Sequence, residues 1–261
     1  MLRRSSVAIL LFPLSVSPLA ANADSTYRSL PFFQDWSDTA MIKANNDWTG
    51  VPGILGYRGD NLVTTDGGNP ATIVAPGVGT PFSIIANQAN PHSLASGGIA
   101  EFELADPSVA LQGSSTADAP FLLLHLDTRG WHDIHVQYQL RDLDGSSDNA
   151  VQPVALQYRL GESGDFTNLA AAFVADATAG PSLVGLMTPV STVLPVFAAG
   201  ADHLQLRFIT ANAVGSDEWV GVDRISISGT PVAAVPEPGE WLLMLSGLGI
   251  LGLMSKRRLT V

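Results

Sequence analysis

The 261-residue chain contains no cysteine, which excludes disulfides, thiolate metal ligands and a cysteine nucleophile. Positive charge is also scarce. Five basic and two acidic residues lie in the two terminal segments: Arg3, Arg4, Lys256, Arg257 and Arg258, with Glu237 and Glu240. The remaining body has 8 Lys or Arg and 22 Asp or Glu, a net charge of −14. Such a surface repels phosphate backbones, so we expect no nucleic-acid partner. The body of about 210 residues is long enough to form a core without disulfides.

No part of the body shows a sustained helical period, whereas several segments alternate apolar and polar residues. Alternation with period two predicts half-buried antiparallel strands. One further run is apolar on both faces and predicts a central strand. The alternating segments are 98–104, 133–141, 154–160 and 203–209, and the doubly apolar run is 120–126. We expect the polar positions, for example Glu101 and Glu103, to form solvated faces.

Many short strands separated by Gly- and Pro-rich turns predict an all-β fold, an antiparallel β-sandwich of jelly-roll type. Val220 and Val222 occupy even positions, but Ile225 and Ile227 occupy odd ones. This change of parity predicts a β-bulge near 223–224. Residues 25–97 are rich in turn residues and give no clear strand boundaries.

Residues 1–23 have the composition of a secretory signal peptide, with a basic start and an apolar stretch from Val7 to Leu19. Ala21-Asn22-Ala23 provides a small-x-small cleavage site, so we expect the mature chain to begin at Asp24. The β-sandwich domain is then 24–229, followed by a Pro-rich linker at 230–240. The alternative is that the first segment stays in the membrane as a helix.

The C-terminal segment 235–261 has the sequence VPEPGEWLLMLSGLGILGLMSKRRLTV. Its apolar run, 241–254, would be about 21 Å long as a helix, whereas a bilayer core is about 30 Å thick. The basic cluster after this run favours a cytoplasmic end. We therefore expect 241–261 to be a hydrophobic sorting or transmembrane anchor helix, with an unprocessed anchor as the alternative.

The order of a Pro-Glu-Pro triplet, an apolar run and a basic end resembles the PEP-CTERM sorting segment. The residues concerned are Pro236, Glu237, Pro238, Lys256, Arg257 and Arg258. The resemblance covers 235–258 and implies processing by an exosortase-type enzyme. It also implies attachment to the membrane of a Gram-negative bacterium before processing, and a final place in the cell envelope or the exopolysaccharide matrix.

A second resemblance concerns the body. The segments DLDGSSDNAVQPVALQYRLG (142–161), FVADATAGPSL (173–183) and DEWVGVDRISI (217–227) are similar to the non-catalytic β-sandwich domain beside the nuclease domain of large secreted bacterial nucleases. This implies an accessory module. The present chain has no nuclease domain next to it, so nuclease activity does not transfer.

Asp142, Asp144 and Asp148 crowd one glycine-containing turn and are candidate calcium ligands. The alternative is a turn in which these side chains only cap their own backbone.

Asp217, Glu218 and Asp223 are a weaker candidate for a structural ion. His132 and His135 are three apart on a predicted strand and should point to opposite faces, which disfavours zinc. Four body tryptophans are candidates for stacking on sugar rings or for the core: Trp36, Trp48, Trp131 and Trp219.

No nucleophile elbow, phosphate loop or dinucleotide fingerprint is present, so no catalytic residue is assigned. The favoured function is an exported, non-enzymatic surface or matrix protein, with glycans and calcium as candidate ligands. The alternative is a secreted hydrolase of extracellular polymers. It would require two carboxylates about 5–10 Å apart in a cleft.

Overall fold

The computed structural model describes residues 23–63, 65–77, 82–144, 150–179, 185–233, 243–248 and 250–251. The strands are β1 (Arg28–Ser29), β2 (Phe32–Gln34), β3 (Ile54–Tyr57), β4 (Ile85–Gln88), β5 (Gly98–Phe102), β6 (Ser108–Gln112), β7 (Phe121–Asp127), β8 (Trp131–Asp142), β9 (Ala155–Leu160), β10 (Thr167–Asn168), β11 (Met187–Val193), β12 (Leu204–Ile209) and β13 (Val220–Pro231). Single 3-10 turns are η1 (Thr39–Met41), η2 (Pro70–Thr72), η3 (Pro91–Ser93), η4 (Ala170–Ala172) and η5 (Val196–Ala198).

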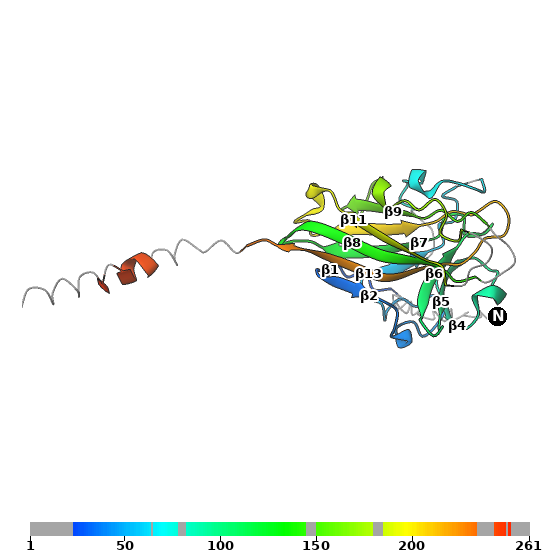
Figure 1. Ribbon diagram of the computed structural model, residues 1–261, viewed down its shortest axis with the longest axis horizontal. Helices are drawn as coiled ribbons and strands as arrows, with labels where there is room; N and C mark the ends of the chain where they lie inside the picture. Colours follow the sequence, from blue (N-terminus) through cyan, green and yellow to red (C-terminus); the bar gives the residue numbers. More distant parts are fainter. Residues whose placement is uncertain are drawn as a thin grey trace, which may run out of the picture.

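The strands form two sheets packed as a sandwich (Figure 1). The six-stranded sheet has the order β1-β7-β12-β9-β10, with β3 also paired to β7. The seven-stranded sheet has the order β11-β8-β13-β6-β5-β4, with β2 also paired to β13. The predicted all-β sandwich is confirmed. The sheets are mixed, however, because β1 runs parallel to β7 and β4 runs parallel to β5.

The main core lies between the sheets and is filled by the inward apolar positions of both. The four strands predicted from alternation are present as β5, β8, β9 and β12, and the strand predicted from the doubly apolar run is present as β7. The bulge is also confirmed, because the pairing of β13 with β8 shifts register between Asp223 and Ser226. Arg224, inside the bulge, has a φ of 49°, a left-handed conformation that is uncommon outside glycine.

The expectation of solvated polar faces is wrong for three of these strands. On β9 and β12 the polar positions are buried; they are Gln157, Arg159, Gln205 and Arg207. The segment around η2 covers Gln157 and Arg207, since Gln157 Nε2 donates to the carbonyl of Pro70 at 2.9 Å and Arg207 Nη1 to that of Ala75 at 2.7 Å. On β5, Glu101 is also buried and accepts a hydrogen bond from the backbone N–H of Asn87 at 3.1 Å. Loops therefore bury strand faces that the alternating pattern alone predicts to be exposed to solvent.

Three of the four body tryptophans belong to the core. Trp36, Trp48 and Trp219 are buried, and the indole N–H of each donates to a backbone carbonyl. A buried indole with a satisfied N–H is the usual core arrangement. These three rings therefore present no face to a ligand, whereas Trp131 at the start of β8 is partly exposed.

The last strand leads to the C-terminal segment. Beyond β13, the Val232 N–H donates to the carbonyl of Gly130 at 2.8 Å. Residues 243–248 and 250–251 are helical and exposed, and Figure 1 draws them beyond the end of β13. Among the described residues, no helix is both long and apolar enough to cross a membrane. Residues 1–22 of the predicted signal segment 1–23 and most of the linker lie outside the described residues. So do all six predicted sorting residues: Pro236, Glu237, Pro238, Lys256, Arg257 and Arg258.

Candidate functional site

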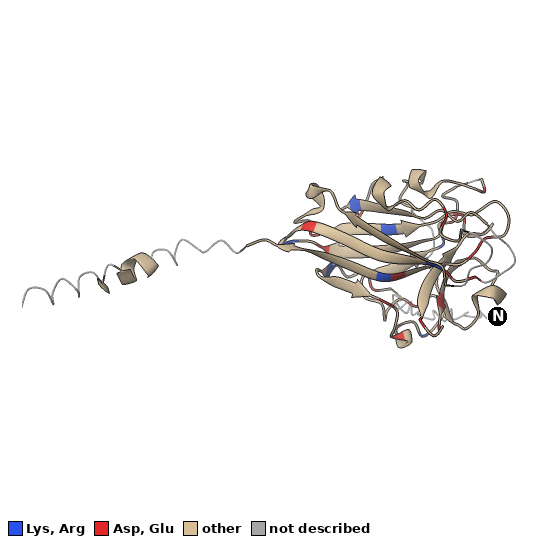
Figure 2. Cartoon of the chain, in the orientation of Figure 1, with Lys and Arg blue, Asp and Glu red and all other residues tan. Residues whose placement is uncertain are grey.

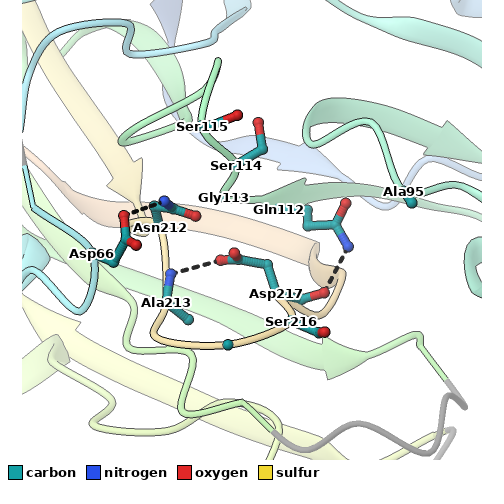
Figure 3. Close-up of a pocket in the computed structure, with 11 residues that line it drawn as sticks. Asp66, Ala95, Gln112, Gly113, Ser114, Ser115, Asn212, Ala213, Ser216 and Asp217 are labelled. Atoms are coloured by element: carbon teal, nitrogen blue, oxygen red, sulfur yellow. Dashed lines mark hydrogen bonds between the residues drawn. The ribbon is translucent and has the colours of Figure 1, made fainter.

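A polar opening of about 370 Å³ lies at the end of the sandwich where β13 begins. We call it the distal cleft, because the chain leaves the sandwich at the other end of β13. Four loops contribute its lining, and their residues are Asp66, Ala95, Gln112, Gly113, Ser114, Ser115, Asn212, Ala213, Gly215, Ser216 and Asp217. Figure 3 shows the side chains of Asp66, Asn212 and Asp217 around this opening. The cleft is therefore built from segments that are distant in sequence.

Asp217 organises the β12–β13 loop. Its Oδ1 accepts hydrogen bonds from the Ala213 N–H at 2.8 Å and from Gln152 Nε2 at 2.7 Å. Its backbone carbonyl accepts from Gln112 Nε2 at 2.8 Å, and Gln112 Oε1 accepts in turn from the Gly97 N–H at 3.1 Å. These bonds tie the loop to the end of β6 and to the chain before β5, so this wall of the cleft is fixed before any ligand binds.

Asp66 and Asn212 form the adjoining wall. Asn212 Nδ2 donates to Asp66 Oδ1 at 2.7 Å, and the Asn212 carbonyl accepts from the Gly67 N–H at 2.7 Å. The Asn212 N–H donates to the carbonyl of Asp118 at 2.9 Å. The side-chain oxygen of Asn212 is left out of these contacts. Asn212 therefore joins three loops while it still offers an acceptor to the cleft.

Gly113 permits the close approach of these loops. A Cβ atom at this position would lie 2.4 Å from Asn212 Cα and 2.4 Å from Asp217 Oδ1. Real side chains do not tolerate such distances, so any other residue would push the β6–β7 and β12–β13 loops apart. The shape of the cleft thus depends on the absence of a side chain at Gly113.

A second cavity of about 330 Å³ adjoins the distal cleft. The two share Asp66, Ser115 and Asn212 in their linings, and the second adds Asn61, Val63, Thr65 and Asp118. The Asp118 carboxylate accepts a hydrogen bond from the Asn61 N–H at 2.6 Å. Because the two cavities share three lining residues, they are direct neighbours at this end of the sandwich.

The electrostatics of the cleft follow from its burial. Burial raises the pKa of the Asp217 carboxyl, and the nearby Asp66 charge adds to this, while the bonds from Ala213 and Gln152 oppose it. The residues that line the two cavities include three carboxylates and no Lys, Arg or His. Carboxylate, amide and hydroxyl groups together can exchange hydrogen bonds with a polyhydroxylated ligand.

The predicted calcium ligands lie elsewhere. Asp142 ends β8 and is fully buried, Asp144 follows it and is also buried, and Asp148 lies outside the described residues. Burial raises the pKa of the neighbouring Glu218 to about 7, with further contributions from the charges of Asp142 and Asp144. Within the part of the chain that the structure describes, no three His, Asp or Glu side chains are grouped so as to hold a metal ion.

The weaker metal candidates do not form one site. Asp217 lies in the distal cleft, Glu218 accepts from the Ala150 N–H at 3.1 Å, and Asp223 lies 3.0 Å from Arg141 Nη1. Their side chains have three different sets of partners, which gives each a local structural role. His132 instead contacts the exposed Asp133 at 2.8 Å.

Sequence reasoning missed most of the cleft. No pattern in the sequence predicts Asp66, Gln112 or Asn212 as cleft residues, and the pattern around Asp217 predicts only a metal ligand. Asp66 stands in the turn Asp66-Gly67-Gly68, whose composition already favours an exposed loop. Its partner Asn212 is 146 residues away, so only the fold brings the two together.

No family model matches the chain, and no curated protein matches it. Several solved structures are weakly similar. One is a carbohydrate-binding module, CBM28, specific for non-crystalline cellulose, with 13% identity over 55% of this chain and 88% of that chain and a TM-score of 0.38. TmCBM61 in complex with β-1,4-galactotriose has 8% identity over 48% and 71%, and a TM-score of 0.32. A cyclase from Fischerella sp. TAU has 12% identity over 70% and 87%, and a TM-score of 0.38. Because all three scores are below 0.5, no activity is transferred from these proteins.

Proposed function

We propose that the protein is an exported, non-enzymatic surface or matrix protein that binds a glycan in the distal cleft. The observation that supports this most directly is the lining of the cleft, where amide, hydroxyl and carboxylate groups surround a preformed opening. Sugar hydroxyls both donate and accept hydrogen bonds, and such mixed groups match them. The contiguous second cavity suits a chain of several sugar units.

The position of the cleft supports the same proposal. Val220, at the start of β13, pairs with Asp142, whereas Pro231, at its end, pairs with Trp131. The cleft and the C-terminal segment are thus separated by the length of this strand, about 40 Å for 12 residues. If the C-terminal segment holds the protein at the envelope, the cleft faces away from it.

Binding of the purified protein to a glycan array tests the cleft. Asn212→Ala removes the partner of Asp66 and an open acceptor, and we expect a loss of affinity of about two- to tenfold, in line with about 0.5–1.5 kcal/mol for a neutral hydrogen bond. Thr167→Ala on the edge strand β10 is the control and should bind as wild type. Wild-type protein that binds no glycan, or equal binding by both variants, would refute the proposal.

The sorting function of 235–261 is proposed from the Pro-Glu-Pro tail and its apolar run. Removal of 235–261 should release a folded body into the medium, because β13 and its contact at Val232 remain intact. Replacing Pro236, Glu237 and Pro238 by alanine separates two mechanisms. If the wild-type tail is processed and the variant tail is not, a processing enzyme recognises the triplet, whereas a tail that stays uncleaved in both proteins indicates a simple anchor.

A hydrolase remains the second candidate, because Asp66 and Asp217 line one cleft and burial raises the pKa of Asp217. Two carboxyl groups in one cleft, in environments that differ, are the arrangement of a glycosidase acid and base. Asp217→Asn would then abolish turnover of a bound polysaccharide while leaving binding in place. If wild-type protein releases no reducing ends from any glycan that it binds, the non-enzymatic proposal stands.

A further inference from the structure

The outer face of the seven-stranded sheet is a second polar surface, separate from the distal cleft. Ser191 on β11 and Ser226 on β13 both lie opposite Gln137 on β8, and Ser226 also lies opposite Phe33 on β2. These four residues form a row across four neighbouring strands, about 14 Å long at ~4.8 Å per strand. We call this row, together with the adjacent Gln139 and Pro189, the outer platform.

The platform is hollowed. A depression of about 450 Å³ lies on it, lined by Gln137, Tyr138, Gln139, Pro189, Val190, Ser191, Arg224 and Ser226. The side-chain amide that is exposed here belongs to Gln137, whereas the Oε1 atom of Gln139 is buried. The bulge at Arg224 interrupts the flat sheet at one edge of the depression. A hollowed surface that exposes the polar side chains of Gln137 and Ser191 can hold a chain that lies across the strands.

The platform lacks charge although the body is strongly acidic. From Ile134 to Leu140, β8 contains no Lys, Arg, Asp or Glu, and neither does the whole of β2 or β11. Figure 2 shows the middle of β8 in tan between its charged ends. Arg224 is the one charged residue that lines the depression, and its Nη2 donates to Asp106 Oδ2 at 3.1 Å. Solvated sheet faces usually contain Lys and Glu, so a face of amides and hydroxyls, whose one arginine is paired with Asp106, favours an uncharged partner.

Phe33 adds an apolar element at the end of the row. Its side chain is 62% exposed, although large aromatic side chains are normally buried. It belongs to the short strand β2 and faces outward beside Ser226, while its neighbours Phe32 and Gln34 are covered to a greater extent. An exposed ring next to hydrogen-bonding groups can pack against the C–H face of a sugar.

We propose that the outer platform binds an extended, uncharged polysaccharide that lies across β11, β8, β13 and β2. The amides and hydroxyls of the row bond to its hydroxyls, and Phe33 packs against one sugar ring. Anionic polymers are disfavoured because the acidic body repels them. This site does not depend on the distal cleft. A protein with both sites could hold two chains at once, which raises its apparent affinity for a polymer network.

Affinity electrophoresis of the full-length protein in gels with a soluble neutral β-glucan tests the platform, with alginate as the anionic comparison. We expect the β-glucan to retard the wild-type protein and alginate not to retard it. Phe33→Ala and Gln137→Ala should each weaken retardation at least tenfold. Both positions are exposed, so circular dichroism and the melting temperature should be unchanged. Thr167→Ala on the other sheet is the matched control.

The same gels separate this proposal from the function of the cleft. Asn212→Ala should leave retardation by β-glucan intact, because the platform is unchanged. If Asn212→Ala abolishes retardation while Phe33→Ala and Gln137→Ala do not, the glycan binds in the cleft and the platform proposal is wrong. Absence of retardation of the wild type, or stronger retardation by alginate, also overturns it.

Discussion

Arg141 Nη1 lies 3.0 Å from Asp223 Oδ2, and this ion pair joins β8 to β13 at the bulge. Asp223 is fully buried, and only a tenth of the Arg141 side chain is exposed. The same guanidinium nitrogen donates to the carbonyl of Asp106 at 3.0 Å, so the loop before β6 is held as well. The irregular pairing of the bulge is thus stabilised by a charged contact in the sheet.

Asp223→Ala should strongly destabilise the fold, by about 3–5 kcal/mol, because it leaves a buried guanidinium without its carboxylate. Urea unfolding followed by tryptophan fluorescence measures the change. Asp106→Ala is the control, since its half-exposed carboxylate lies 3.4 Å from Arg141 and should contribute less than about 1 kcal/mol. Equal losses for the two variants would contradict a special role for the buried pair.

Stability should fall as pH rises from about 4.5 through 7. Burial raises the pKa of Glu101 and of Glu218 from 4.5 to about 7, so the folded state holds these protons more tightly than the unfolded state. The resulting stabilisation is complete below pH 4.5 and is lost as pH rises through 7, at a cost of order 2–3 kcal/mol per group. Glu101→Gln mimics the protonated form and should flatten this dependence in melting curves at pH 5 and 8. An unchanged slope would show that Glu101 does not titrate in this range.

Calcium remains the predicted ligand of the turn that contains Asp142, Asp144 and Asp148. Millimolar calcium should raise the melting temperature, and a chelator should reverse the effect. At a hundredfold excess of calcium over Kd, the free energy of unfolding should increase by about 2.7 kcal/mol. The gain should be larger at pH 8 than at pH 5.5, because the neighbouring Glu218 is then ionised. Asp144→Asn should lose the gain, and Asp133→Asn, at the exposed start of β8, should keep it. Identical curves with calcium and chelator would leave the segment as a turn only.

Gly113→Ala should destabilise the distal end of the sandwich by about 1–3 kcal/mol, because the added methyl group meets Asn212 and Asp217 at 2.4 Å. Gly68→Ala is the matched control. Its nearest contacts would be 3.8 Å away, and we expect a change within about 0.5 kcal/mol. Chemical denaturation compares the two. If Gly113→Ala also weakens glycan binding beyond its effect on stability, the spacing of the loops matters for the ligand.

The strands could be predicted because alternation along each one survives in the fold. On β8 the outward residues His135 and Gln137 are exposed as expected. On β12 the same pattern misleads, since Arg207 is buried between the rings of Phe166 and Phe121, at 4.0 Å and 5.2 Å from their centroids. Periodicity gives the two faces of a strand but not the loop that later covers one of them.

The distal cleft was beyond sequence reasoning for a related reason. Asp66 and Asn212 are ordinary turn residues in their own segments, and no spacing links them. The pairing of β12 and β7 fixes where the chain after Ile209 emerges, and the loop that contains Asp66 reaches the same end of the sandwich. Such a site depends on tertiary geometry and leaves no local motif.

The course of β13 determines how the molecule would respond to tension. A pull between a polymer held in the distal cleft and an anchor at the C-terminal segment acts along this strand, which pairs with β8 on one side and with β6 and β2 on the other. Force parallel to the strand loads all of its interstrand hydrogen bonds at the same time. These bonds are therefore not broken one after another from one end. The geometry therefore favours resistance to mechanical unfolding in a protein that has no disulfides.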